Sequence, residues 1–386
     1  MHITQVTPRF PPAVGGLEEH VYQISLELLK RGHEVTVITS DEVDEKTSLP
    51  KKEVMQGIRV YRFPLFMSKA FREYWLVPDI LKWFPHLRGD VVHVHGYRCL
   101  SSFIATNLAH IENVPVVFTP HGIYPPRSFA NAMMKSIFDH TFGRLMLKLS
   151  DRIIALTEHN MRLLLQIGAS ASRIAVVPNG VNIEEYENIQ RSQKTLDELG
   201  SDGPILLYVG RIDWNKRLEK IVEAMPLILK EFPSARFVIL GPDYAKYTSQ
   251  LSKLAKKLRV EHSLVMTGSI SREKLLAFYS IADIFLLPSS YEGFGLSMLE
   301  AMGSKVPVIV SPVGGPGDIL RHGVHAWLLR NSTSVEIFEA VDTVLTDNQL
   351  RKTLVKNAFD LVKAKYTWTR VVDELEIIYK QVAIGK

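Results

Sequence analysis

The chain has 386 residues, which is enough for two domains that each bury a core of their own. Hydrophobic residues make up 46% of it and charged residues 23%, a globular composition that excludes a disordered or fibrous protein. The formal net charge of +5 is a small excess that indicates no particular partner, and we expect no nucleic acid among the partners.

The cysteine content and the first residues indicate the cellular compartment of the protein. Cys99 is the only cysteine, which excludes an internal disulfide and a zinc site built on cysteine. The first residues run directly into a strand-like stretch without a basic and apolar leader, and no apolar run is long enough to span a bilayer. We therefore expect a cytoplasmic protein, and a peripheral position on the cytosolic face of a membrane stays open.

In the first half of the chain, short runs of β-branched residues alternate with amphipathic stretches. After the first run, Leu17, Val21, Ile24 and Leu28 recur at helical spacing, and Gly32 stands where that helix would end. Repeated alternation of strand and helix predicts a parallel sheet with crossover helices. We expect its strands at residues 3–6, 34–38, 58–62, 91–94, 114–118, 153–155 and 175–177.

A domain boundary is expected where turn residues at 178–182 lead into a polar stretch at 184–203. We place the first domain at residues 1–185 and the second at residues 186–366, where the alternation of strand and helix starts again. The chain is thus predicted to be an α/β protein with two Rossmann-like, doubly wound domains and an interdomain cleft at the carboxyl ends of their strands. In the second domain we expect strands at 205–209, 237–240, 264–267, 284–287 and 306–310, and helices at 218–232, 247–258, 272–281 and 337–345.

Gly15 and Gly16 stand between the first predicted strand and the first predicted helix. Glycines let a backbone approach a ligand closely, and the free N–H groups at the start of a helix attract phosphate. The pair is therefore a candidate phosphate contact, with a plain connecting turn as the alternative.

Arg211 and Lys216 lie in a loop that follows the first predicted strand of the second domain. A guanidinium fork and an ammonium charge can together neutralise one diphosphate, which a departing nucleoside diphosphate requires. A solvated basic loop is the alternative. The position after a strand raises the odds of a functional role.

Glu292 and Glu300 are separated by seven residues, with a Gly-Phe-Gly turn after the first and a helical run around the second. Eight helical steps would set the two backbones roughly 12 Å apart, which suits two contacts along one extended ligand. The paired carboxylates of a glycoside hydrolase lie only about 5 to 9.5 Å apart, so the spacing does not favour hydrolysis. The alternative is that neither carboxylate binds a ligand, with Glu292 favoured at a helix start by the helix dipole and Glu300 on an exposed face.

Taken together, these motifs resemble glycosyltransferase family 4, whose members are retaining enzymes with the GT-B fold. The resemblance extends over nearly the whole chain, and the combination is far more specific than any one motif. In chain order, the motifs are Gly15-Gly16, Gly210-Arg211 to Lys216, Glu292-Gly293-Phe294-Gly295 with Glu300, and Val313-Gly314-Gly315.

The resemblance implies roles for individual residues. Arg211 and Lys216 would hold the diphosphate of a nucleotide sugar, with the backbone of Gly16 approaching it from the first domain. Glu300 would bind the ribose hydroxyls, and His121 would face the transferred sugar. As in the family, a helix at about 367–386 would pack back on the first domain. Further donor contacts would come from Glu292, from the backbone of Gly15, Gly293, Phe294, Gly295 and Leu296, and, at the base, from Gly268, Ser269 and Ile270.

Two features need separate comment. Asp318 stands where the family commonly has glutamate after the glycine pair, which weakens any assignment in that loop. His93 and His95 alternate on a predicted strand and would face the same side, where they could serve a metal or an acceptor hydroxyl. Because neither cysteine nor a paired acidic cluster accompanies them, we expect ordinary hydrogen bonds and no metal site.

The resemblance implies transfer of a glycosyl group from a nucleoside-diphosphate sugar to a hydroxyl acceptor, with the anomeric configuration retained. Arg211 and Lys216 would replace a metal ion at the leaving diphosphate, so we expect no cofactor and no metal requirement. Two alternatives stay open: a sugar-nucleotide epimerase or hydrolase on the same scaffold, and a non-enzymatic bilobal sugar-binding protein. The sequence carries no readable signature for the donor base, the donor sugar or the acceptor.

The stretch at 63–88 interleaves aromatic rings with cations, a composition that suits the interface of an anionic membrane. If it binds a membrane, the acceptor is expected to be a lipid-linked sugar or a phospholipid. Packing into the first domain's core or lining a groove for a soluble acceptor is the alternative. The residues concerned are Phe66, Lys69, Phe71, Arg72, Tyr74, Trp75, Lys82, Trp83, Phe84 and Arg88.

Overall fold

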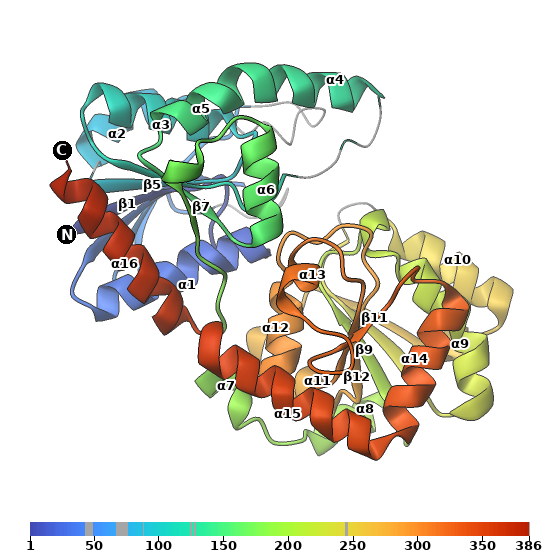
Figure 1. The fold of residues 1–386 in the computed structure, drawn as a ribbon. Helices are drawn as coiled ribbons and strands as arrows, with labels where there is room; N and C mark the ends of the chain where they lie inside the picture. Colours follow the sequence, from blue (N-terminus) through green and yellow to red (C-terminus); the bar gives the residue numbers. More distant parts are fainter. Residues whose placement is uncertain are drawn as a thin grey trace. The chain divides into compact units, whose positions relative to one another are not determined.

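The chain forms two compact units (Figure 1). Unit 1 contains residues 1–179 and 368–386, and unit 2 contains residues 180–367. Each unit is built on one mainly parallel sheet, so the prediction of two Rossmann-like α/β domains is confirmed. The computed structural model describes residues 1–42, 49–66, 76–87, 89–123, 126, 129–243 and 246–385.

The described strands of unit 1 are β1 (His2–Val6), β2 (Glu34–Ser40), β3 (Lys52–Met55), β4 (Ile58–Phe63), β5 (Val91–His95), β6 (Val116–Thr119), β7 (Arg152–Ala155) and β8 (Ile174–Val176). Their order in the sheet is β3-β4-β2-β1-β5-β6-β7-β8. Every neighbouring pair is parallel except β3 and β4. The central strands are buried on both faces, which is why β5 is buried along its whole length.

The described helices of unit 1 are α1 (Gly16–Lys30), α2 (Ile80–Leu87), α3 (Leu100–Ile111), α4 (Phe129–Phe138), the π-helix η2 (Asp139–Gly143), α5 (Arg144–Leu149), α6 (Glu158–Gln166), the 3-10 turn η3 (Ala171–Arg173) and α16 (Trp368–Ile384). Helices α1 and α16 pack together on one face of the sheet, and α3 and α5 cover the other (Figure 1). An ion pair of 3.1 Å between Arg31 and Glu376 links α1 to α16. The last helix is therefore part of unit 1.

The described strands of unit 2 are β9 (Ile205–Val209), β10 (Arg236–Leu240), β11 (Leu264–Gly268), β12 (Ile284–Leu287), β13 (Val308–Val310) and β14 (Trp327–Leu328). They form a parallel sheet in the order β11-β10-β9-β12-β13-β14. Around it lie α7 (Ile183–Glu187), α8 (Gln193–Leu199), η4 (Trp214–Lys216), α9 (Leu218–Glu231), α10 (Thr248–Leu258), η5 (Glu261–Ser263), α11 (Arg272–Ile281), α12 (Leu296–Gly303), α13 (Gly315–Ile319), α14 (Ser334–Thr346) and α15 (Asn348–Lys365).

The boundary between the units differs from the prediction. Residues 180–185, which we placed in the first domain, belong to unit 2. The physical reason is α7, which packs against α12 and buries Ile183 and Tyr186. The turn after Asn179 therefore ends unit 1, and the second unit begins before the polar stretch.

Each sheet has one point where the strand order reverses, between β1 and β5 in unit 1 and between β9 and β12 in unit 2. At such a point, the loops that follow the two strands turn to opposite faces and leave a crevice in which α/β proteins bind ligands. The Gly15-Gly16 turn follows β1, and the Arg211–Lys216 loop follows β9. The fold therefore places both motifs at the reversal points.

No membrane-spanning segment is found in the part of the chain that the structure describes, because none of its helices combines the length and the apolar character that crossing a bilayer requires.

Candidate active site

In unit 2, the loop after β9 meets the loop after β12. The Lys216 ammonium donates to the Glu292 carboxylate at 2.6 Å, and the two side chains are only 12% and 15% exposed. The backbone N–H of Ser290 also donates to the carbonyl oxygen of Asn215 at 2.7 Å. Two motifs far apart in sequence are thus joined at the reversal point of the sheet.

A pair of glycines completes this group of loops. The N–H of Gly315 donates to the carbonyl oxygen of Glu292 at 3.2 Å. A Cβ on Gly314 would lie 1.9 Å from the Glu292 carbonyl oxygen, and one on Gly315 would lie 2.6 Å from the Cα of Phe294. Gly314 also has φ +64, in the left-handed region. Only glycine therefore allows the loop after β13 to lie this close to the Glu292 loop.

A buried tyrosine fixes the backbone at Arg211. The buried Tyr208 hydroxyl donates to the carbonyl oxygen of Arg211 at 2.7 Å. Burial raises the pKa of Tyr208 well above its usual value of 10, so the hydroxyl keeps its proton and remains a donor. Gly210, at φ +150, would bring a Cβ to 2.9 Å from that hydroxyl, so the turn into the loop requires glycine.

Glu300 is held on α12 by three side chains. Tyr186 donates to its Oε1 at 2.7 Å, and Tyr279 donates to its Oε2 at 2.9 Å. Arg272 lies 3.1 Å from Oε1 and also pairs with Glu185 at 2.7 Å. Burial first, and then the charge of Glu300, raise the pKa of both tyrosines well above 10. Since a carboxylate offers about four acceptor sites, Oε2 keeps one for a ligand hydroxyl.

The segment predicted to meet the base lies at the end of β11. Gly268 has φ +70, and its carbonyl oxygen accepts from the N–H of Gly241 at 2.9 Å. Ile270 is half-buried, and Arg272 begins α11 two residues later. Through Arg272, this segment is connected to Glu300.

In unit 1, Gly16 is the first residue of α1 and Gly15 precedes it. A Cβ on Gly15 would lie 2.3 Å from the Glu18 carboxylate, which is buried and pairs with Arg9 at 2.6 Å. The turn is therefore packed tightly against an ion pair at the start of the helix.

His121 follows β6 in the left-handed conformation, with φ 62, which few non-glycine residues adopt outside turns and functional sites. Its Nε2 lies 3.0 Å from Nδ1 of His95, whose Nε2 lies 2.6 Å from Oε1 of Gln5. With the Gln5 amide oriented so that Oε1 faces His95, His95 carries its proton on Nε2, and its Nδ1 accepts from His121. His121 is left with Nδ1 as an acceptor, and no described residue occupies it.

Two more buried histidines surround this pair. The Nδ1–H of His20 donates a hydrogen bond to Oδ1 of Asn179 at 2.7 Å. The other ring nitrogen of His20, Nε2, has no partner among the described residues. Burial lowers the pKa of His20 to about 4, although the Asn179 hydrogen bond opposes the shift. Burial also lowers the pKa values of His93, His95 and His121 well below 6.5. All four rings are therefore neutral at pH 7.

His93 and His95 do face the same side of β5, with ring centroids 4.0 Å apart. Both nitrogens of His93 make hydrogen bonds of 2.7 Å, to Tyr379 and to Thr119, so His93 has the ordinary role that we expected. The described residues nevertheless contain one trio with metal-ligand geometry: His20, His95 and His121 bring one ring nitrogen each within 4.8 Å of one another. The absence of a metal requirement stays a prediction.

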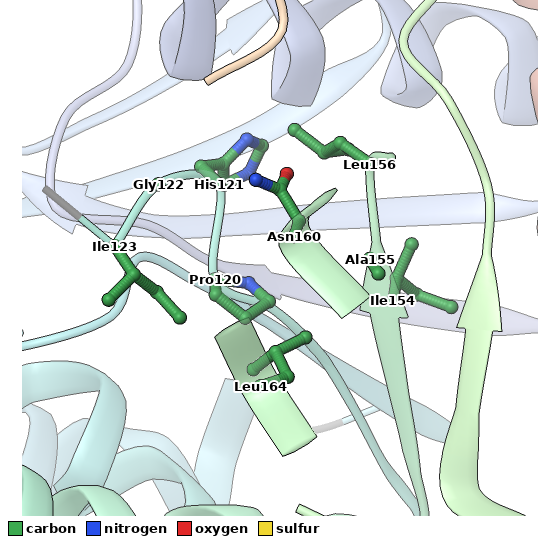
Figure 2. A pocket seen from close by; sticks show the side chains of 9 residues that line it. All are labelled: Pro120, His121, Gly122, Ile123, Ile154, Ala155, Leu156, Asn160 and Leu164. Atoms are coloured by element: carbon green, nitrogen blue, oxygen red, sulfur yellow. The ribbon is translucent and has the colours of Figure 1, made fainter. Parts of the chain in front are cut away.

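A small pocket opens beside His121 at the carboxyl ends of β6 and β7 (Figure 2). Ile154, Leu156 and Leu164 supply apolar walls, and Asn160 of α6 also lines it. The Asn160 amide nitrogen is buried and has no hydrogen-bond partner among the described residues. A ligand hydroxyl in the pocket would therefore meet an amide donor beside the imidazole.

The structure brings the predicted residues of unit 2 together at two places. In unit 2, Lys216, Glu292, the glycine loops and Arg211 lie at the reversal point, and Glu300 lies beside the base segment. Sequence reasoning missed their partners, for which no local motif gave a signal: Gln5, His20, Asn160, Asn179, Tyr186, Arg272 and Tyr279.

At one position of the stretch 63–88, the structure agrees with the alternative of packing into the core of the first domain. Phe84 is fully buried in the core of unit 1, so it is not available to a membrane. Phe66 and Lys82 are exposed. The residues Lys69, Phe71, Arg72, Tyr74, Trp75 and Arg88, and the side chain of Trp83, lie outside the described part of the chain.

Two units, each built on a doubly wound, mainly parallel sheet, are the architecture of the GT-B fold. The solved structure of sucrose-phosphate synthase from Thermosynechococcus elongatus has the same fold, with a TM-score of 0.84 and 22% identity over 100% of both chains.

Sequence comparison places the chain within this class. The family description Glycosyltransferase Family 4 matches residues 14–185, and Glycosyl transferases group 1 matches residues 190–360. An uncharacterized glycosyltransferase of Methanocaldococcus jannaschii is 30% identical over 98% of this chain and 98% of its own length. A GDP-mannose:cellobiosyl-diphosphopolyprenol alpha-mannosyltransferase of Xanthomonas campestris is 27% identical over 81% of this chain and 79% of its own length. The chain belongs to glycosyltransferase family 4 and is a glycosyltransferase.

Proposed function

We propose that this glycosyltransferase uses a nucleoside-diphosphate sugar and transfers its glycosyl group to a hydroxyl acceptor with retention of configuration. The bond from the anomeric carbon to the diphosphate oxygen breaks, and a bond to the acceptor oxygen forms on the same face. The acceptor proton passes to a donor phosphate oxygen. Membership of the family favours transfer over the epimerase, hydrolase and sugar-binding alternatives.

The observation that carries the proposal is the Lys216–Glu292 pair at the reversal point of the unit 2 sheet. Glu292 holds the ammonium in place before any ligand binds, so its charge needs no reorganisation when a diphosphate leaves. Fixed positive charge of this kind stabilises a departing anion strongly. Arg211, in the same loop, supplies the second cation, and no metal ion is required in this scheme.

The remaining contacts follow from the geometry of each group. Glu300 uses the open acceptor site of Oε2 for a ribose hydroxyl, and Gly268 and Ile270 meet the base. Glu292 and the backbone from Gly293 to Leu296 hold the sugar and phosphates. The free Nδ1 of His121 accepts a hydrogen bond from a sugar hydroxyl, and Gly15 and Gly16 contact the diphosphate through their N–H groups.

For the acceptor, we propose a lipid-linked compound presented at the cytosolic face of a membrane. The name of the relative from Xanthomonas campestris contains a diphosphopolyprenol acceptor and a GDP-mannose donor, which supports this class of acceptor and a nucleoside-diphosphate donor. The protein would then work in the cytoplasm and visit the membrane.

A donor panel tests the proposal. UDP-, GDP- and ADP-sugars are incubated with the chelator-treated protein, with and without a lipid extract, and nucleotide release is measured together with the anomeric configuration of the product. We expect release with one donor class, strongly stimulated by the lipid extract, and a retained configuration. An inverted product, release that depends on added metal, or equal release without acceptor would overturn the corresponding part.

A further inference from the structure

Three histidines meet at the point where the strand order of unit 1 reverses. His95 is the last residue of β5, His121 follows the neighbouring strand β6, and His20 lies near the start of α1, the helix after β1. Each ring brings one nitrogen within 4.8 Å of the other two. Imidazoles from three different elements therefore converge on one place.

One ring nitrogen of His20, Nε2, is buried without a hydrogen-bond partner among the described residues. The opposite nitrogen, Nδ1, donates to Oδ1 of Asn179, so the proton of the neutral ring lies on Nδ1. Nε2 therefore carries a bare lone pair. The ring of His20 contacts the ring of His121 edge-on, with centroids 4.7 Å apart. A buried acceptor without a donor is costly, and a cation in the cluster would satisfy it.

His95 presents a second lone pair to the same cluster. Its Nε2 donates to Oε1 of Gln5, which leaves Nδ1 as an acceptor, 3.0 Å from Nε2 of His121. When a metal ion binds, the proton on Nε2 of His121 moves to Nδ1 of the same ring, and Nε2 becomes the third ligand. Asn179 and Gln5 then serve as the outer hydrogen-bond acceptors that orient metal-binding histidines.

The spacing of the three nitrogens is close to that of a zinc site. Zn–N bonds of about 2.0–2.1 Å at tetrahedral angles set ligand nitrogens about 3.4 Å apart. The separation between His95 and His121 is 3.0 Å, and the farthest pair of the trio, at no more than 4.8 Å, has to close by at most about 1.4 Å. Small side-chain rotations cover this change. Three neutral imidazoles suit Zn²⁺, whereas Mg²⁺ and Ca²⁺ prefer oxygen ligands.

The cluster is accessible from the side of His121. The ring of His121 is half-buried and lines the pocket at the carboxyl ends of β6 and β7, beside Asn160 (Figure 2). His20 and His95 are buried behind it. A zinc site with three protein ligands keeps its fourth position for water or another small ligand. An ion can thus enter past His121.

We propose that His20, His95 and His121 form a binding site for Zn²⁺ in unit 1, and that the bound ion inhibits glycosyl transfer. Binding does not depend on the proposed function. Inhibition rests on it, because Nδ1 of His121 is proposed to accept a hydrogen bond from a sugar hydroxyl. With Zn²⁺ on Nε2, Nδ1 carries the proton and can no longer accept, so the sugar loses this contact.

Zinc binding is measured without any donor, on full-length protein that carries no polyhistidine tag and has been treated with a chelator. Competition with a chromophoric chelator gives stoichiometry and affinity, and wild type is expected to bind a single Zn²⁺. His20→Gln removes one ligand and should weaken binding by about a hundredfold or more, because few ligands share the binding free energy. Asn179→Ala removes only the acceptor that orients His20 and should weaken binding by about ten- to a hundredfold.

Two control variants remove histidines outside the trio. His93→Gln replaces a buried neighbour whose nitrogens already bond Tyr379 and Thr119. His140→Gln replaces an exposed histidine of unit 1, so this control does not depend on core packing. Both variants are expected to bind Zn²⁺ as tightly as wild type. Circular dichroism confirms that each variant is folded.

The position of the ion is tested with Co²⁺, which occupies zinc sites and quenches nearby tryptophan fluorescence. The ring of Trp368 lies 5.6 Å from the ring of His20, measured between centroids. Co²⁺ is expected to quench wild type and to give the visible absorption of a tetrahedral site. Trp368→Phe should keep the absorption and lose much of the quenching. Excess Mg²⁺ should not displace the ion.

Inhibition is measured as the transfer rate with Zn²⁺ relative to the rate of the same protein with chelator. Wild type should lose about tenfold, the effect of one lost hydrogen bond, and His20→Gln should lose much less at the same Zn²⁺ concentration. Any Zn²⁺ bound by the nucleotide itself affects both proteins equally, so it cancels in the comparison.

Three results would overturn the site and leave the proposed transfer untouched: no zinc binding by wild type, equal affinity in wild type and folded His20→Gln, or undiminished quenching in Trp368→Phe. Zinc binding with the expected pattern but without inhibition would instead refute the inhibition and the sugar contact proposed for His121, and the metal site would stand.

Discussion

Acid should destabilise unit 1 through His20, and the size of the effect follows from its burial. The pKa of His20 is about 4 in the folded chain, against 6.5 for an unburied histidine. Above pH 6.5, His20 is neutral in both the folded and unfolded states, so it contributes no pH dependence. As the pH falls from 6.5 toward 4, His20 becomes protonated in the unfolded state but stays neutral in the folded state. The free energy of unfolding therefore decreases.

Between about pH 7.5 and about pH 5, this difference amounts to a loss of about 2 kcal/mol in the free energy of unfolding, and to about 3 kcal/mol below pH 4. We propose His20→Gln as the test, because glutamine is neutral at every pH and its amide can still donate to Asn179. Urea unfolding of both proteins at several pH values, followed by tryptophan fluorescence and circular dichroism, gives the comparison.

The variant should lose about 2 kcal/mol less than wild type over the same pH range. His93, His95 and His121 are present in both proteins, and burial, the largest cause of their lowered pKa values, is common to both; only the smaller contribution of the His20 charge to these pKa values differs. Equal acid sensitivity of the two proteins would show that His20 titrates normally, and the account of a neutral buried cluster would then be refuted.

Two further predictions concern the donor site. Glu300→Gln should weaken the affinity for the nucleoside diphosphate in calorimetric titration, because Tyr186, Tyr279 and Arg272 lose their charged partner, whereas Glu292→Gln should chiefly lower the rate of transfer; unchanged affinity in Glu300→Gln would remove the ribose assignment. Gly314→Ala should destabilise the fold by about 2 kcal/mol or more and impair nucleotide binding, since its Cβ would meet the Glu292 carbonyl oxygen at 1.9 Å. Gly200→Ala is the control, because Gly200 has φ +56 but nothing within 4 Å; similar losses in both variants would contradict the close-approach argument.

Much of the fold was predictable because its strands are short apolar runs between turns. The strands Ile205–Val209 and Ile284–Leu287 begin and end where the sequence predicts them. The predictions at 114–118 and 306–310 each begin two residues early, because Pro115 and Pro307 lack the N–H that a paired strand residue donates.

Elements with weak hydrophobic patterns were missed. Strand β3 is an edge strand with charged residues, and α15 is a polar helix that buries only Leu354, Ala358 and Val362. Both are held by neighbours from elsewhere in the chain, through β4 and α12. Tertiary packing rather than local periodicity determines such elements.

In the candidate site, too, some features could be predicted from local sequence and others depend on tertiary packing. Its loops were predictable because each motif is contiguous and follows a strand. The partners that orient them are distant in sequence: Gln5 reaches His121 only through His95, and Tyr186 and Arg272 meet Glu300 only after α7, α11 and α12 have packed. Reading the sequence locally gives no means of pairing such residues.

The central claim is that fixed cations in the loop after β9 stabilise the departing diphosphate. It is tested most directly by turnover of the donor found in the panel, measured for Arg211→Ala and Lys216→Ala, with circular dichroism to confirm folding. The account predicts that each substitution lowers turnover about a hundredfold or more, the usual effect of losing one charge-stabilising donor. Near-normal turnover in both folded variants would contradict it.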